Sequence, residues 1–297
     1  MNYLYIETLS GISGDMTVGA LLDMGADRAK LDKALSTIKA EGFEIAISQV
    51  KKSGLACTDF DVKLDQHHDG HDHDMEYLYG HLHSPESIEA SGHHHSHGEE
   101  HHDHHHSHGQ SNHDHNHGHS HSHRGMAEIN AILDGVDMSA GARTLTDRIF
   151  AILAQAESKA HGVPVDQVHF HEVGAIDSIV DIVAAAVCFD DLMTRYQVAE
   201  VIVPKLYEGQ GTVRCQHGIL PVPVPAVANI AADYGIPMEI INVNGELVTP
   251  TGAAIVAAMR GSAPMPATFE IKTIGYGAGK RDYGLAGFVR ILLVEEK

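Results

Sequence analysis

Residues 177–193 read DSIVDIVAAAVCFDDLM, an apolar run in a chain whose formal net charge is −20. From Ser178 to Phe189 the side chains are small or apolar, apart from the carboxyl group of Asp181. A helix that is apolar on nearly all sides belongs in a protein interior. The pattern therefore predicts a helix that is buried on much of its circumference.

The rest of the chain alternates irregularly between strand and helix patterns. A strand pattern at 2–9, a turn at 10–16 and a helix open the chain, and a second helix follows, capped by Asp27 and ended by Gly42. Two strands are expected around a turn at Ser53 and Gly54, and strand patterns close the chain. This order predicts an α+β fold class, with a mixed α/β folded region.

The middle of the chain breaks this pattern. Between Asp65 and Arg124 lie 22 of the 26 histidines, together with 11 carboxylates and one cationic side chain, and apolar periodicity is lost. High polarity and low complexity predict a disordered His-rich insertion in the absence of metal. The chain accordingly divides into a first folded part at 1–64, the insertion at 65–124 and the remainder of the folded region at 125–297.

The insertion is a candidate metal-binding segment. Neutral imidazole binds Ni²⁺, Zn²⁺, Cu²⁺ and Co²⁺, and the interspersed carboxylates attract divalent cations. Because nearly every histidine has others close by, we expect several weak, exchanging sites. Composition alone does not select nickel over zinc, and a solvated linker that binds metal incidentally is the alternative. The candidate ligands are His93, His94, His95, His97, His101, His102, His104, His105, His106 and His108.

Composition also excludes several partners and locations. The acidic balance argues against nucleic acid and against an anionic membrane surface as partners. No apolar run reaches about 18 residues, and the N-terminus lacks a signal-peptide pattern. The cysteines, Cys57, Cys188 and Cys215, form no CxxC pair, which fits a reducing compartment. We therefore expect a cytoplasmic protein.

The strongest catalytic candidates lie in HFHEVGAIDSIVDI, residues 169–182. His169 and His171 share one face of a predicted strand, and Glu172 follows toward the loop. Asp177 and Asp181 lie one turn apart on the same face of the apolar helix. These groups could hold a metal or relay protons. In the alternative, structural interpretation, Asp177 is a helix N-terminal residue and His169 is a core histidine.

Three turns are candidates for binding a phosphate group or its metal ion. SGISGDM leads into a helix whose backbone amides could contact an anion, while its aspartate could hold Mg²⁺ or cap the helix. TPTGAA resembles another helix start, and GYGAGKRDY offers a cation in a Gly-rich segment. Ordinary caps and turns are the alternative. The candidate cofactor-binding residues are Ser13, Gly14, Asp15, Thr251, Gly252 and Lys280.

One further pair is ambiguous. In GQGTVRCQHG, Cys215 and His217 lie on one face of a predicted strand. They could ligate a metal ion, or they could be a buried cysteine beside a structural histidine. The sequence leaves both interpretations open.

Six segments together resemble one known family. They are SGISGDM at 10–16, the His-rich tract, HFHEVGAIDSIVDI at 169–182, GQGTVRCQHGILPVPVPA at 209–226, ELVTPTGAAI at 246–255 and GYGAGKRD at 275–282. In this order they resemble the LarC family, the nickel-insertion proteins that complete the nickel-pincer cofactor of lactate racemase.

The resemblance implies that the chain binds Ni²⁺ and inserts it into pyridinium-3,5-bisthiocarboxylic acid mononucleotide. The implied reaction is a CTP-dependent cyclometallation of the lyase class, in which two sulfurs and one ring carbon become nickel ligands. Lactate racemase is then the downstream recipient.

The resemblance also implies a missing part. Family members continue into a C-terminal domain associated with CTP and with Mg²⁺ or Mn²⁺, so this chain is expected to need a separate C-terminal LarC polypeptide. The alternative function is that of a non-catalytic nickel storage protein or metallochaperone. A homo-oligomer is compatible with either function.

Overall fold

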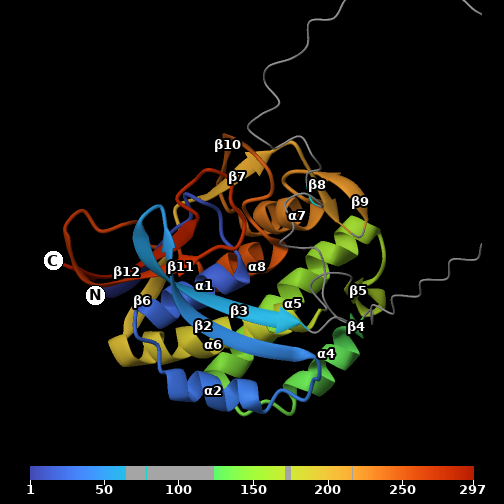
Figure 1. Ribbon diagram of the computed structural model, residues 1–297, viewed down its shortest axis with the longest axis horizontal. Coiled ribbons are helices and arrows are strands. Elements are labelled where there is room, and N and C mark those ends of the chain that lie inside the picture. The colour runs from blue at the N-terminus through green and yellow to red at the C-terminus, as the bar shows by residue number, and fades with distance from the viewer. Residues whose placement is uncertain (65–77, 79–123, 171–174, 216) are drawn as a thin grey trace, which may run out of the picture.

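The computed structural model describes residues 1–64, 78, 124–170, 175–215 and 217–297 (Figure 1). Helices and mixed sheets both build the folded region, which confirms the α+β fold class. The strands are β1 (Asn2–Glu7), β2 (Phe43–Lys52), β3 (Leu55–Leu64), β4 (Arg124–Gly125), β5 (His169–Phe170), β6 (Val198–Ile202), β7 (Leu206–Gln210), β8 (Thr212–Cys215), β9 (Gly218–Pro221), β10 (Met238–Asn244), β11 (Phe269–Ala278) and β12 (Phe288–Glu296). The helices are α1 (Gly14–Asp23), α2 (Arg28–Ser36), α4 (Met126–Leu133), α5 (Ala140–His161), the 3₁₀ turn η2 (Val165–Gln167), α6 (Ile176–Tyr196), α7 (Pro225–Tyr234) and α8 (Pro250–Met259).

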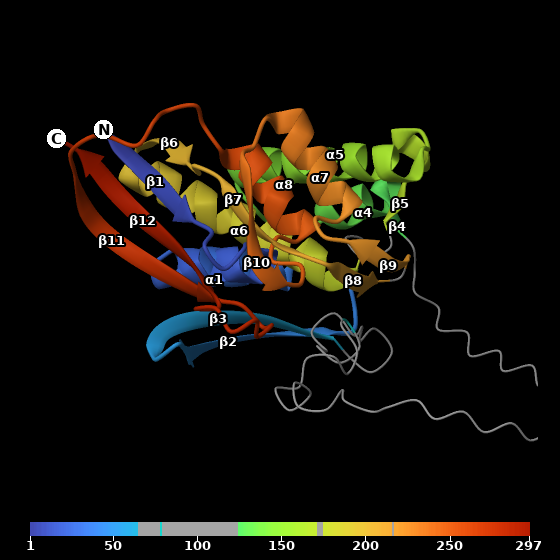
Figure 2. The ribbon, with the colours of Figure 1, turned by 90° about the horizontal axis from the view of Figure 1, so that it is seen from above.

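In the described part of the chain, six strands form the main sheet, in the order β2-β3-β11-β12-β1-β6. Strand β1 pairs antiparallel with β12 along its whole length and parallel with β6 on its other side. The last long strand therefore lies beside the first, and the two ends of the chain meet at one corner of the sheet (Figures 1 and 2). Shorter two-stranded sheets pair β7 with β10, β8 with β9, and β4 with β5.

The helices stack in layers on the inner face of the sheet (Figure 2). Helix α1 packs directly on β11, β3 and β12, and α6 packs on α1 and α2. Helix α5 covers α6 from the other side and also contacts α7 and α8. This arrangement places α6 between α1 and α5, in the middle of the molecule.

Helix α6 confirms the prediction made from its apolar run. Its central turns from Ile179 to Ala186 are almost completely buried, apart from Asp181, which is half-buried. Each fully buried Val or Ile side chain stabilises the fold by about 2 kcal/mol relative to an exposed one. No helix within the described part of the chain is long and apolar enough to cross a membrane.

Helix α1 approaches β11 closely because glycines face it. A Cβ atom built on Gly277 would lie 1.8 Å from the carbonyl oxygen of Met16, and one built on Gly275 would lie 2.0 Å from that of Ala20. Real atoms do not approach so closely, so no side chain fits at either position. The Gly-rich segment before Lys280 therefore sets the distance between α1 and the sheet.

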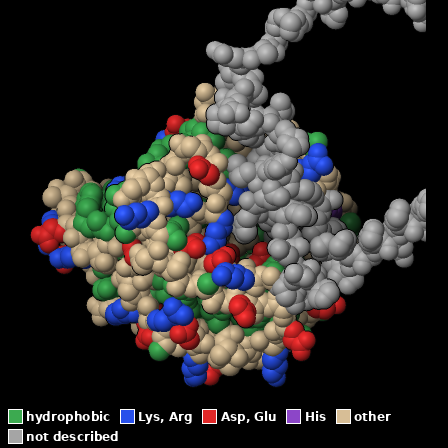
Figure 3. Space-filling model, in the orientation of Figure 1, with side chains coloured by type: hydrophobic (Ala, Val, Ile, Leu, Met, Phe, Trp, Pro, Cys, Tyr) green, Lys and Arg blue, Asp and Glu red, His purple; other side chains and the backbone are tan. Residues whose placement is uncertain are grey.

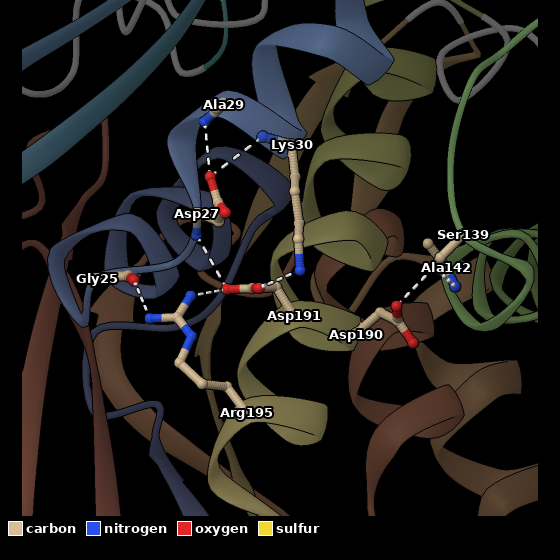
Figure 4. Close-up of polar contacts among 9 residues, drawn as sticks. All are labelled: Gly25, Asp27, Ala29, Lys30, Ser139, Ala142, Asp190, Asp191 and Arg195. Atoms are coloured by element: carbon tan, nitrogen blue, oxygen red, sulfur yellow. Dashed lines mark hydrogen bonds and ion pairs between the residues drawn. The ribbon is translucent and has the colours of Figure 1, made fainter.

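A buried carboxylate joins α2 to the C-terminal end of α6 (Figure 4). Asp191 on α6 accepts hydrogen bonds from Lys30 Nζ at 2.8 Å and from the Asp27 amide at 3.0 Å, and it also pairs with Arg195. Burial alone would raise the pKa of Asp191, but these donors outweigh it and lower the pKa overall. The network fixes the entry of α2, where Asp27 caps the helix as predicted.

Some predicted boundaries were wrong. Helix α2 ends at Ser36 and does not continue to Gly42, because the amide and hydroxyl of Thr37 both bind the Ala34 carbonyl and close the last turn. The turn at Ser53 and Gly54 is confirmed, with β2 and β3 paired antiparallel around it. The predicted His-rich insertion lies outside the described residues except at Leu78 and Arg124, so its predicted disorder stays a prediction.

Candidate functional site

A cavity of about 310 Å³ opens between the helix layers and the β8–β9 hairpin. This volume is within the range of small-molecule sites. Acidic and basic side chains lie side by side on the face shown in Figure 3, so neither sign of charge dominates it. Most of the predicted active-site and cofactor residues that the structure describes line the cavity, namely Ser13, Gly14, Asp15, Asp177, Asp181, Thr251 and Lys280.

Among the residues that the structure describes, four helices begin at the cavity wall. Residues 13–15 open α1, residues 177–178 lie in the first turn of α6, residues 224–226 open α7 and residues 249–251 open α8. The first backbone N–H groups of a helix have no partner within the helix, and the helix dipole places partial positive charge there. Four such ends directed at one cavity favour a bound anion such as a phosphate group.

The residue that caps α8 differs from the one predicted near its start. Thr249, two residues before the predicted Thr251, caps α8 by accepting a hydrogen bond from the Gly252 amide at 3.1 Å. Gly252 packs against the backbone of Ile12, where an added Cβ atom would lie 2.2 Å from the carbonyl oxygen. At the start of α1, Ser13 donates its hydroxyl to Asp15.

Asp181 is a buried, strongly perturbed acid of the cavity. Its Oδ1 atom is shielded from solvent and has no hydrogen-bond partner among the described residues. Burial raises the pKa of Asp181 well above its ordinary value, and the negative charges of Asp15 and Asp177 raise it further. Gly14 makes this close packing feasible, because a Cβ atom there would lie 2.5 Å from Asp181 Oδ2. Asp181 therefore accepts a proton more readily than an exposed aspartate does.

Lys280 supplies a positive charge on the same wall. Its Nζ atom lies 2.5 Å from Asp59 Oδ1 and 3.2 Å from Asp61 Oδ1. Burial alone would lower the pKa of Lys280, but the hydrogen bond to Asp59 and the charges of Asp61 and Asp15 outweigh it and raise the pKa. The ammonium group thus stays charged, and it partly offsets the repulsion between the cavity carboxylates.

A second cation lies beside Lys280. Arg281 donates to Glu246 Oε2 at 2.8 Å, and the Tyr283 hydroxyl donates to the Glu246 carbonyl oxygen at 2.8 Å. Glu246 is buried and lines the cavity, although the sequence did not single it out. An acid beside an arginine 35 residues away in the sequence gives no local signal, because the tertiary fold brings their two loops together.

The β8–β9 hairpin and the end of α5 bring a thiol and two imidazoles to the cavity mouth, side chains that differ from the carboxylates elsewhere in the cavity. Cys215 Sγ lies 3.8 Å from His217 Nδ1, and the His161 and His217 rings are 4.9 Å apart between centroids. Glu157 Oε2 lies 3.4 Å from His161 Nε2. Burial lowers the pKa of His217, and the nearby His161 lowers it further, which favours the neutral imidazole. All four residues line the cavity.

The remaining predicted site residues either lie away from the cavity or fall outside the described part of the chain. His169 is exposed on β5, which pairs with β4, and it does not line the cavity. His171 and Glu172 lie outside the described residues, as do the predicted tract ligands His93, His94, His95, His97, His101, His102, His104, His105, His106 and His108. The proximity of His171 to the two aspartates therefore stays a prediction.

A buried carboxyl group supports the wall behind the cavity. Glu208 on β7 accepts hydrogen bonds through Oε1 from the amides of Gly209 at 2.8 Å, Leu247 at 2.7 Å and Val248 at 3.2 Å. Its Oε2 atom is buried without a partner among the described residues. Burial raises the pKa of Glu208 to about 7, despite these amides.

This raised pKa predicts a pH-dependent stability. The folded state holds the Glu208 proton up to pH near 7, whereas the unfolded chain releases it near the ordinary glutamate pKa of about 4.3. The stabilisation is therefore complete at low pH and is lost as pH rises through 7. Between pH 5.5 and 8 we expect the wild type to lose about 2 kcal/mol more than Glu208→Gln, which cannot titrate. Urea denaturation at both pH values measures the difference, and equal losses would contradict the assignment.

Comparison with known proteins gives the family. The model of the nickel insertion protein family matches residues 4–297. The chain is 45% identical to the pyridinium-3,5-bisthiocarboxylic acid mononucleotide nickel insertion protein of Alkaliphilus metalliredigens, over 99% of this chain and 61% of that protein. It is 40% identical to the protein of the same name from Clostridium acetobutylicum, over 100% of this chain and 65% of the relative.

A third such relative, from Lactiplantibacillus plantarum, is 36% identical over 100% of this chain and 62% of its own length. The chain thus spans somewhat less than two thirds of the curated relatives it matches. No solved structure matches it. The match to the family model over nearly the whole chain, together with these identities, shows that the chain belongs to the nickel insertion protein family.

Proposed function

We propose that this chain takes part in inserting Ni²⁺ into pyridinium-3,5-bisthiocarboxylic acid mononucleotide, and that the mononucleotide binds in the cavity. The relatives carry this activity in their names. The observation that carries the proposal is the meeting of four helix N-termini with two close carboxyl groups in one cavity. The substrate carries a phosphate, which the helix N-termini can bind, and a ring C–H bond that must be broken, for which a carboxyl group can accept the proton.

The helix N-termini and Lys280 bind the phosphate in this proposal. The mononucleotide phosphate carries a negative charge near pH 7, and the amides opening α1 present N–H donors to it. Lys280 adds a full positive charge, which its carboxylate neighbours keep protonated. Binding the phosphate at this wall leaves the ring free to lie toward the two aspartates of α6.

Asp181 and Asp177 handle the ring proton. Formation of the nickel–carbon bond replaces a C–H bond, so one proton leaves to a base while nickel remains Ni²⁺ and no electron is transferred. Asp181 suits this step because burial and the neighbouring Asp177 charge raise its pKa and strengthen it as a proton acceptor. The reaction class is that of a nickel chelatase or cyclometallase, within the lyases.

The His-rich tract supplies the metal. Leu78 lines the cavity, and His93 follows 15 residues later in the sequence. An extended chain covers about 3.5 Å per residue, so a 15-residue link reaches about 50 Å. Every part of the cavity mouth is therefore within reach of His93, the first of the candidate nickel ligands, and weakly bound nickel can be delivered locally.

The remaining components belong to a longer assembly. From the family resemblance, we propose that a C-terminal polypeptide takes part in the reaction and brings CTP with Mg²⁺ or Mn²⁺. The cytoplasm is the proposed location, and lactate racemase is the proposed recipient of the finished cofactor. These assignments follow the family resemblance, and the location also follows the cysteine usage of the chain.

Deletion of residues 65–124 distinguishes a nickel insertase from a nickel storage protein, which is the alternative function that the His-rich tract suggests. In a reaction completed by the C-terminal polypeptide, an insertase without the tract keeps its rate at plentiful free nickel and slows when nickel is scarce. The measurement is nickelated mononucleotide per unit time, by mass spectrometry, at two nickel concentrations. A full loss of product at both concentrations, with the folded part intact by circular dichroism, would instead assign the central role to the tract.

A further inference from the structure

The tight turn between β8 and β9 brings a thiol and an imidazole together. Cys215 ends β8, His217 precedes Gly218 at the start of β9, and Gly218 adopts φ +92°, which a glycine allows without strain. The Sγ–Nδ1 distance of 3.8 Å is close to the separation of about 3.6 Å that two such ligands have on one tetrahedral metal ion. The strand pairing of β8 with β9 holds this geometry.

A third ligand comes from a different element. His161 is the last residue of α5, and its ring lies 4.9 Å from that of His217. Glu157, one turn earlier, lies 3.4 Å from the Nε2 atom of His161, the arrangement in which a carboxylate orients a metal-binding histidine. Side chains from α5 and from the hairpin thus meet at the cavity wall, with the two ring nitrogens needed for a mixed sulfur–nitrogen site.

We propose that Cys215, His217 and His161 bind one nickel ion at the cavity mouth, with Glu157 positioning His161. This site deepens the proposed function, on which it rests: it would hold nickel between the His-rich tract and the carboxylates of α6. No three side chains in the described part of the chain already stand at metal-binding distance, so binding needs rotation of the two imidazole rings. Both histidines are exposed enough to rotate.

The ligand set selects among metals. Thiolate and imidazole favour Ni²⁺, Cu²⁺ and Zn²⁺, whereas Mg²⁺ and Mn²⁺ prefer carboxylate and phosphate oxygens. A sulfur–nitrogen site therefore binds nickel in preference to the Mg²⁺ or Mn²⁺ that accompanies a nucleoside triphosphate. Binding converts the Cys215 thiol into a thiolate and releases one proton to solvent.

A sulfur-to-nickel charge-transfer absorption tests the site in the full chain. The tract contains no cysteine, and Cys57 and Cys188 are buried, so among the three cysteines of the chain the signal reports on Cys215. Titration with Ni²⁺ alone is expected to give a band that grows and saturates once Cys215 is fully occupied, while the histidines of the tract take up further nickel without contributing to it. Cys215→Ser should abolish it, His217→Ala and His161→Ala should weaken the apparent affinity at least about 10-fold, and Cys57→Ala should retain it.

Three results would overturn the site: no band in the wild type, a band that persists in Cys215→Ser, or wild-type affinity in both histidine variants. Glu157→Gln gives a further test, because a positioning carboxylate predicts weaker nickel binding with an unchanged band shape. The titration contains neither CTP nor mononucleotide. Its failure therefore removes this metal site alone, while loss of the proposed function would appear only in the insertion assay.

Discussion

Asp181→Asn is expected to lower nickel insertion by at least about 100-fold while nickel uptake stays unchanged. A positioned acid or base contributes about 10²–10⁴ to a rate, and an amide cannot take up the ring proton. Asn is nearly the same size as Asp, so the contact with Gly14 is kept. Nickelated product measured over time in the completed reaction gives the rate, and equilibrium dialysis gives nickel uptake.

The stability of the same variant distinguishes a chemical role from a packing role. Asp181 carries a raised pKa because burial and the charges of Asp15 and Asp177 disfavour its ionised form. Replacing it with a neutral amide removes that repulsion, so the free energy of unfolding near pH 7 should be unchanged or increased. A stable variant with wild-type turnover would remove Asp181 from the mechanism. A matched control is Asp190→Asn, which alters a carboxylate of α6 bound to Ser139 outside the cavity.

Gly277→Ala is expected to destabilise the fold by about 3 kcal/mol or more. The new methyl group would lie 1.8 Å from the Met16 carbonyl oxygen and 2.5 Å from the Ala20 amide nitrogen, both in the backbone of α1. Backbone atoms cannot move aside as a flexible side chain does, and overpacking of this kind costs about 1–3 kcal/mol or more. Helix α1 must therefore shift away from β11, together with the cavity residues at its start.

Urea denaturation measures this effect, with Gly135→Ala as the control. A methyl group at Gly135 would meet its nearest atom, the Ile132 carbonyl oxygen, at 3.5 Å, an ordinary contact distance. Its unfolding free energy should change by less than about 0.5 kcal/mol. If Gly277→Ala were as stable as this control, the close packing of α1 on the sheet would be wrong.

The parts predicted correctly from the sequence depend on local patterns. The apolar run predicted the buried α6, and the four-residue spacing of Asp177 and Asp181 placed both carboxyl groups on the cavity face. Asp27 was predicted as a cap from its place before a helix pattern, and the structure confirms it, since its side chain accepts from amides two and three residues away. Such patterns involve residues that are close in sequence, so they can be recognised without knowledge of the tertiary structure.

The parts that were missed depend on contacts between distant segments. Glu208 binds amides about 40 residues away, and Glu246 meets Arg281 across 35 residues. Neither acid stands out in its own segment, because the tertiary packing of distant segments decides what it faces. The convergence of four helix N-termini is of the same kind: each turn was visible separately, but their common direction follows from the packing of α1, α6, α7 and α8 around one cavity.

The central claim is that this cavity is where nickel becomes bonded to carbon and sulfur of the mononucleotide. The most direct test combines this chain, Ni²⁺, CTP with Mg²⁺ or Mn²⁺, and the thiocarboxylate mononucleotide, with and without a separately made C-terminal polypeptide. Mass spectrometry then looks for a product that has gained one nickel and lost the ring proton. The account predicts this product with wild-type chain and completing polypeptide, and almost none with Asp181→Asn. Nickel that remains bound to protein histidines, with no nickelated mononucleotide under any of these conditions, would contradict it.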